Sequence, residues 1–104
     1  MKISGFRNTD ADNPAGVRVY INKIELKPEG SQKVINHSPD GFEWGYGGSG
    51  PAQLALAILL KATTKEKAVR YYQDFKNEFI VGLPNDDFEL EVDVKGWLEK
   101  QEVA

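Results

Sequence analysis

The chain has 104 residues, of which 40% are hydrophobic and 28% are charged, and this composition is typical of one globular domain with a modest core. It contains no cysteine, which excludes disulfides, thiolate zinc sites and cysteine nucleophiles. The formal net charge of -3 argues against nucleic acid as a partner, because general nucleic-acid binders usually carry a basic surface.

The N-terminal part of the chain predicts three strands. Residues 2–7 form a short strand, and the polar residues 8–16 form a loop dense in turn-forming types. Residues 17–21 alternate between apolar and polar, which is typical of a half-buried strand, and a tight turn at Asn22-Lys23 leads to a third strand at 24–27. We expect this hairpin to end in a turn over 28–31.

The middle of the chain is less regular. A short strand is expected around Val34 and Ile35, with a turn over 37–41. Residues 42–44 are extended, and a glycine-rich run over 45–50 leads to Pro51, a residue that suits the first turn of a helix. The helix expected up to residue 62 is apolar on nearly every face except at Gln53, so it belongs at the centre of the fold.

The C-terminal part predicts two more helices and a strand. A capping box at Thr63 and Glu66 begins the second helix, which ends near Gly82. Residues 88–92 alternate apolar with acidic, and Asp93 can cap a short last helix. Strands gather before helices, which indicates an α+β fold in one domain spanning 1–104: a small antiparallel sheet of about three to four strands, two main helices packed on one face and a short C-terminal helix.

The glycine-rich run carries the most chemical information in this sequence. Gly45, Gly47 and Gly50 satisfy G-x-G-x-x-G, but a second helix follows the first where a dinucleotide-binding fold needs a parallel strand. Pro51 and Ala52 stand where a phosphate-binding P-loop needs lysine and a hydroxyl, so that motif fails too.

A broader ligand hypothesis remains for this segment. Glycines at a helix N-terminus present free N–H groups to an anion or nucleotide, and aromatic rings beside them are able to stack on a base. The candidate ligand-binding residues are Trp44, Tyr46, Gly47, Gly48, Ser49, Gly50, Gln53, His37 and Glu43. The structural alternative is that the glycines make a tight crossover and that Trp44 and Tyr46 belong to the core.

Catalytic groups are scarce. His37, the single histidine, lies beside Ser38 and Asp40, but a catalytic triad converges from distant segments, so a capped turn explains these residues. Glu43 lies beside Trp44, but a single carboxylate without a catalytic partner is weak evidence for acid–base chemistry. We predict no catalytic residue, no metal site and no cofactor.

The run HSPDGFEWGYGGSGPAQLALAIL, residues 37–59, resembles the signature of an uncharacterised family of small bacterial, plasmid and phage proteins, a domain of unknown function. Residues 72–76, Leu83-Pro84 and Trp97-Leu98 match the same pattern. The resemblance implies a prokaryotic or mobile-element setting and no activity.

These observations favour a small non-enzymatic binding or accessory protein that acts through protein contacts. The alternative is a protein that binds a small anion or nucleotide at the glycine-rich loop, and a small enzyme is the weakest hypothesis. The start of the sequence lacks the apolar stretch of a signal peptide, and the longest apolar run, 54–60, is too short to span a bilayer. We therefore expect a cytoplasmic protein without membrane contact, whose oligomeric state the sequence does not indicate.

Overall fold

The computed structural model describes residues 1–7 and 16–103. The loop predicted over 8–16 lies outside these residues except for Gly16. The chain runs through β1 (Lys2–Arg7), β2 (Val17–Ile21), β3 (Ile24–Leu26), α1 (Glu29–Val34), α2 (Ser49–Ala62), α3 (Lys65–Phe75), the π-helical turn η1 (Lys76–Ile80), β4 (Phe88–Glu91) and α4 (Val94–Val103).

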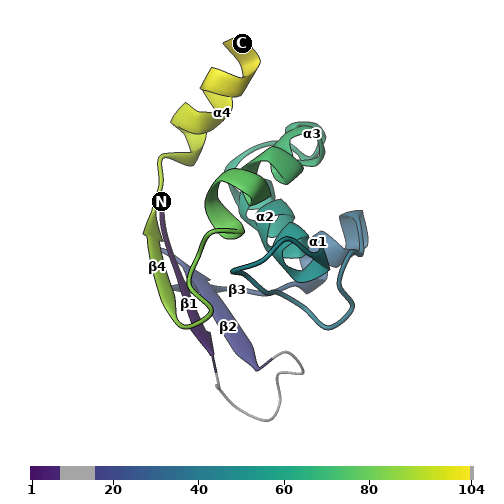
Figure 1. Ribbon diagram of the computed structural model, residues 1–104. Coiled ribbons are helices and arrows are strands. Elements are labelled where there is room, and N and C mark those ends of the chain that lie inside the picture. Colours follow the sequence, from purple (N-terminus) through teal and green to yellow (C-terminus); the bar gives the residue numbers. More distant parts are fainter. Residues whose placement is uncertain (8–15, 104) are drawn as a thin grey trace.

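The strands form one antiparallel sheet in the order β3-β2-β1-β4. The helices α1, α2 and α3 lie on one side of it, and α4 extends beyond the end of β4 (Figure 1). The α+β prediction, with an antiparallel sheet of three to four strands and two main helices, is therefore confirmed. The predicted turn at Asn22-Lys23 is also present, and both residues have the positive φ (50° and 71°) that a two-residue hairpin requires.

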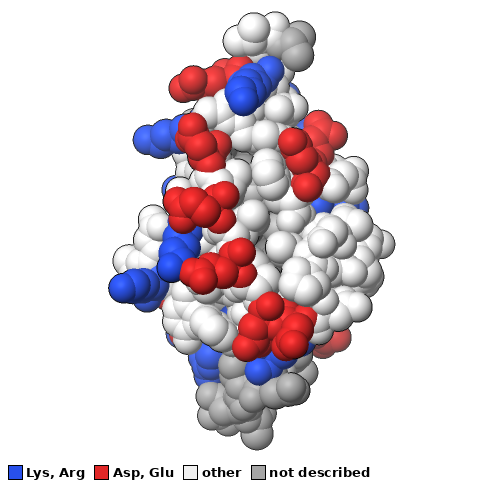
Figure 2. Space-filling model, turned by 60° about the vertical axis from the view of Figure 1, so that its left-hand side comes forward, with Lys and Arg blue, Asp and Glu red and all other residues white. Residues whose placement is uncertain are grey.

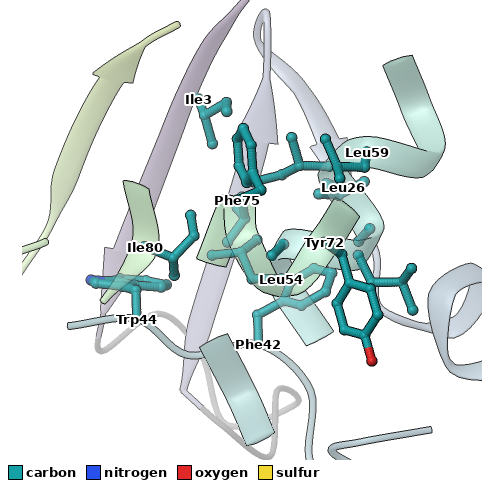
Figure 3. Packing of buried hydrophobic residues seen from close by; sticks show 14 of the residues in the cluster. Ile3, Leu26, Phe42, Trp44, Leu54, Leu59, Tyr72, Phe75 and Ile80 are labelled. Carbon is teal, nitrogen blue, oxygen red and sulfur yellow. The ribbon is translucent and has the colours of Figure 1, made fainter. Parts of the chain in front are cut away.

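The helix α2 is the centre of the core, as its apolar composition predicts. All residues from Gly50 to Leu59 are buried, because the sheet covers one side of α2 and the other helices cover the rest. Leu54 and Leu59 from α2 share one hydrophobic cluster with Ile3 and Leu26 from the sheet and with Phe75 and Ile80 from α3 and η1 (Figure 3).

Two predictions about the segment after β3 are wrong. Residues 28–31 were expected to form a turn and residues around Val34 a strand, but Glu29–Val34 is the helix α1. Pro28 already has helical dihedral angles, and the Ser31 hydroxyl donates a hydrogen bond to the Pro28 carbonyl at 2.8 Å. The buried side chain of Gln53 on α2 also donates a hydrogen bond to Ser31. This tertiary contact stabilises a helix in a segment whose own residues have a weak helix preference.

The start of α3 also differs from the prediction by one residue. The cap is Thr64 instead of Thr63, and its hydroxyl accepts a hydrogen bond from the backbone N–H of Lys67 at 3.3 Å. The predicted cap of α4 is confirmed, because an Asp93 carboxylate oxygen accepts from the Gly96 N–H at 3.0 Å. Within the described residues, no helix is long and apolar enough to cross a membrane.

Candidate functional site

The glycine-rich loop joins the extended residues 42–44 to the N-terminus of α2. The helix begins at Ser49, two residues earlier than predicted, with Gly48 as its N-cap and no side chain capping it. Tyr46, Gly47 and Ser49 are exposed, whereas Gly50 is buried. The loop therefore has an outer rim open to solvent and an inner part packed on the fold.

Trp44 anchors the inner part. It is fully buried, and its indole N–H donates a hydrogen bond to the Asp86 carbonyl at 2.8 Å. Phe88 packs edge-to-face against the indole at 4.8 Å between ring centroids, and the Arg7 guanidinium carbon lies 4.3 Å from the ring centroid. Because the ring is buried, with Phe88 and Arg7 against it, it has the contacts of a core residue, which favours the structural alternative over stacking on a ligand.

Arg7 is the residue of this site that sequence reasoning missed. Its guanidinium forms an ion pair with the Glu43 carboxylate at 2.7 Å and donates to the Trp44 carbonyl at 3.3 Å. The Nε atom of Arg7 is buried and has no hydrogen-bond partner among the described residues. In the sequence Arg7 is only the end of a strand, and nothing there indicates that it meets residues 43 and 44.

The glycines of the loop differ in whether a side chain would fit at their positions. Gly45 has φ of +87°, and a Cβ there would lie 3.0 Å from the Leu83 carbonyl oxygen. A Cβ on Gly50 would lie 2.5 Å from Glu43 Cβ, so only glycine lets the start of α2 pack this closely against residue 43. At Gly48 a Cβ would meet only the movable ring of Tyr46, and at Gly47 it would meet nothing within 4 Å.

Gln53 is buried and uses its whole carboxamide within the protein. Its Nε2 donates to the Ser31 hydroxyl at 2.9 Å and to the Ile35 carbonyl at 3.0 Å. Its Oε1 accepts from the backbone N–H groups of His37 at 2.8 Å and Ser38 at 3.0 Å. A glutamine amide has two donors and two acceptor positions, so none is left for a ligand, and these contacts favour a structural role.

His37 and Glu43, two of the residues considered for acid–base chemistry, have different partners. The imidazole Nε2 of His37 lies 2.5 Å from the hydroxyl of Tyr72 on α3, whereas Glu43 pairs with Arg7 on β1. Among the described residues, no hydrogen bond joins His37, Glu43 and Tyr46, and no group of three or more His, Asp or Glu side chains is placed to hold a metal ion.

A shallow hollow lies beside the loop, lined by Arg7, Glu43, Trp44, Tyr46 and Asn85. It brings together three of the predicted ligand residues, Glu43, Trp44 and Tyr46. Tyr46 is 49% exposed and presents its ring to solvent. An anion entering the hollow would meet Arg7, but Glu43 already neutralises that guanidinium, so the site has little net attraction for an anion.

A second feature lies on the other face of the sheet. Of the elements that the structure describes, none covers this face (Figure 1). Phe6 and Tyr20 alternate with the buried residues of β1 and β2, so they lie on this face, where they form an edge-to-face aromatic pair with 5.8 Å between centroids. Ion pairs flank them: Lys2 with Glu89 at 2.5 Å and Arg18 with Glu25 at 2.9 Å. The hydrogen bond that the Lys2 ammonium donates to the Glu89 carboxylate, together with the negative charge of that carboxylate, raises the pKa of Lys2.

The aromatic pair was not predicted as a site. The alternation of apolar and polar residues that predicts β2 also places Tyr20 on the polar side of that strand. This alternation was the one sequence signal for an exposed aromatic residue there.

Comparison with protein families gave one match: the model of a family of unknown function, DUF6166, matches residues 5–100. Neither the curated proteins nor the solved structures gave a match.

Proposed function

The chain belongs to the DUF6166 family, and we propose that it is a small non-enzymatic protein-binding domain whose contact surface is the helix-free face of the sheet. The observation that carries this proposal is the aromatic pair of Phe6 and Tyr20, which lies on the two inner strands of the sheet with Phe6 42% exposed. An aromatic centre with a charged rim is the usual anatomy of a protein interface.

The shape of this face supports the proposal. A hollow on it is lined by Lys2, Ser4, Phe6, Lys23, Asp87, Phe88 and Glu89. The hollow gives a partner side chain a place to insert beside the Phe6 ring. A prokaryotic or mobile-element origin is part of this proposal and rests on the sequence resemblance of residues 37–59. A cytoplasmic location is also proposed, and it rests on the cysteine-free composition and on the short apolar runs.

The test is capture of a partner by the immobilised protein in matched variants. Phe6→Glu places a charge within the aromatic pair, whereas Val69→Glu makes the same kind of change on α3, where Val69 is 38% exposed. We expect a protein that is retained by the wild type and by Val69→Glu but is lost with Phe6→Glu. If every retained protein tolerates Phe6→Glu equally well, the sheet face is not the contact surface.

The small-ligand alternative keeps one favourable observation, the exposed ring of Tyr46 at the mouth of the hollow beside Arg7. A thermal-shift screen with nucleotides separates it from the main proposal. A ligand at 100 times its dissociation constant stabilises by about 2.7 kcal/mol, and for a domain of this size this raises the melting temperature by roughly ten degrees. We expect no such rise, because the Arg7 charge is already paired.

A further inference from the structure

β4 is an open edge of the sheet. It pairs with β1 on one side, and no described strand lies on its other side (Figure 1). Met1 and Val92 exchange both backbone hydrogen bonds, at 2.9 and 3.0 Å, so they are a hydrogen-bonded pair of the antiparallel ladder between β1 and β4. Because such pairs alternate in antiparallel sheets, Leu90 turns its N–H and C=O toward β1, and Glu89 and Glu91 turn theirs toward the open edge.

The same alternation arranges charge along this edge. Every second residue from 87 to 93 is acidic: Asp87, Glu89, Glu91 and Asp93. The side chains of Glu89 and Glu91 are 60% and 75% exposed, and acidic groups gather along this side of the molecule (Figure 2). Lys2 forms an ion pair with Glu89 and also lies directly opposite Glu91, which is 3.6 Å from the N-terminal amine. These two cations face a row of four carboxylates, so the row keeps a net negative charge.

We propose that β4 accepts, as a fifth and antiparallel strand, an extended segment of a partner protein with Lys or Arg at every second position. This inference rests on the proposed function and names the class of partner. Residues of the incoming strand that lie opposite Glu89 and Glu91 would exchange backbone hydrogen bonds with them, and their side chains would lie on the same face as the two carboxylates. Basic residues at those positions complement the acidic row, and the residues between them face the apolar side of the sheet.

The acidic row also selects against the other occupant, a second copy of this chain. Two β4 strands paired together would bring like charges opposite each other, which is destabilising. The other edge strand, β3, offers only Ile24–Leu26 before Pro28, a proline at which strand pairing stops. The charges that keep β4 from self-pairing therefore leave it open to a cationic strand.

The probe is a synthetic heptapeptide of alternating lysine and valine, titrated into the isotopically labelled full chain while amide chemical shifts are recorded. We expect shifts centred on Glu89 and Glu91 and an affinity that falls with added salt. The same peptide with N-methylated lysine backbones keeps its charge but loses the donors that pair with β4, and we expect it to bind at least about tenfold more weakly.

Variants of the protein complete the test. Glu89→Lys with Glu91→Lys should weaken binding of the lysine–valine peptide by about tenfold or more, because repulsion replaces attraction. Glu66→Lys with Asp74→Lys makes the same charge change at exposed sites on α3 and should leave the affinity unchanged. Glu89→Pro removes one outward N–H, a change that edge strands tolerate, and should also weaken binding.

The proposal is overturned if the lysine–valine peptide does not bind, if its N-methylated form binds as tightly, or if the shifts map away from β4. Self-association of the free protein through β4 would likewise overturn it. Each of these outcomes is distinct from failure of the proposed function, since Phe6→Glu can still abolish partner capture when β4 pairs with no peptide.

Discussion

The side-chain oxygen of Gln53 accepts a hydrogen bond from the backbone N–H of His37 at 2.8 Å, which ties the first turns of α2 to the segment that precedes the glycine-rich loop. The same amide binds Ser31 within the first turn of α1 and Ile35 at its C-cap. One buried polar side chain thus fixes the path of the chain between β3 and the candidate site.

Replacing Gln53 with leucine should destabilise the protein strongly. The variant removes four hydrogen bonds and leaves partly buried backbone groups of Ile35, His37 and Ser38 without these partners, at about 1–3 kcal/mol for each group that water cannot reach. We expect a loss of roughly 3 kcal/mol or more in the free energy of unfolding, measured with urea. Gln73→Leu, the same change at an exposed position of α3, is the control and should stay within about 0.5 kcal/mol.

Two glycines of the loop should respond in opposite ways to alanine. Gly50→Ala places a methyl group 2.5 Å from Glu43 Cβ and 3.0 Å from its backbone nitrogen, so α2 or the Glu43 segment must move. We expect a loss of about 1–3 kcal/mol. Gly47→Ala meets nothing within 4 Å and should be neutral or slightly stabilising. Equal effects in thermal unfolding would contradict a structural role for Gly50.

Arg7→Lys should not be a conservative change. Lysine keeps the charge but loses the planar fork that reaches both Glu43 and the Trp44 carbonyl, and it loses the stacking on the indole. We expect a loss of about 1–2 kcal/mol in urea unfolding. Arg70→Lys is the matched control, because Arg70 is exposed and lies 5.9 Å from the Tyr71 ring centroid. A loss at Arg70 as large as that at Arg7 would contradict this assignment.

The elements that could be predicted are those whose own residues carry the pattern. The alternation at 17–21, the asparagine that tolerates positive φ at the hairpin turn, and the continuous apolar run of α2 are all local signals. The helix α1 could not be predicted, because Pro28, Gly30 and Ser31 are typical turn residues. Its stability depends on a glutamine that is distant in sequence and comes close only in the folded chain.

The candidate site follows the same rule. The sequence singled out Trp44 and Gln53 as candidate ligand-binding residues, but it did not show which protein atoms they bind. Their partners, Asp86 and Ser31, lie 42 and 22 residues away along the chain. The open edge at β4 is the reverse case: its alternating carboxylates are visible in the sequence, and only the strand order reveals that they lie at the border of the sheet.

Gly96 and Asp93 should show a coupling at the start of α4. Alanine in place of a helical glycine normally stabilises by about 1 kcal/mol. Here a Cβ would lie 2.3 Å from a carboxylate oxygen of Asp93, whose other oxygen caps the helix. The aspartate must therefore turn away, and the loss of the cap costs about 1 kcal/mol.

Gly96→Ala alone should consequently change the free energy of unfolding little. In an Asp93→Ala background the cap is already absent, so the same substitution should recover its full gain of about 1 kcal/mol. A double-mutant cycle in urea measures the difference between the two backgrounds as a coupling energy. If Gly96→Ala stabilises both backgrounds equally, the carboxylate moves without loss of the cap, and Gly96 then has no role in the geometry of this helix start.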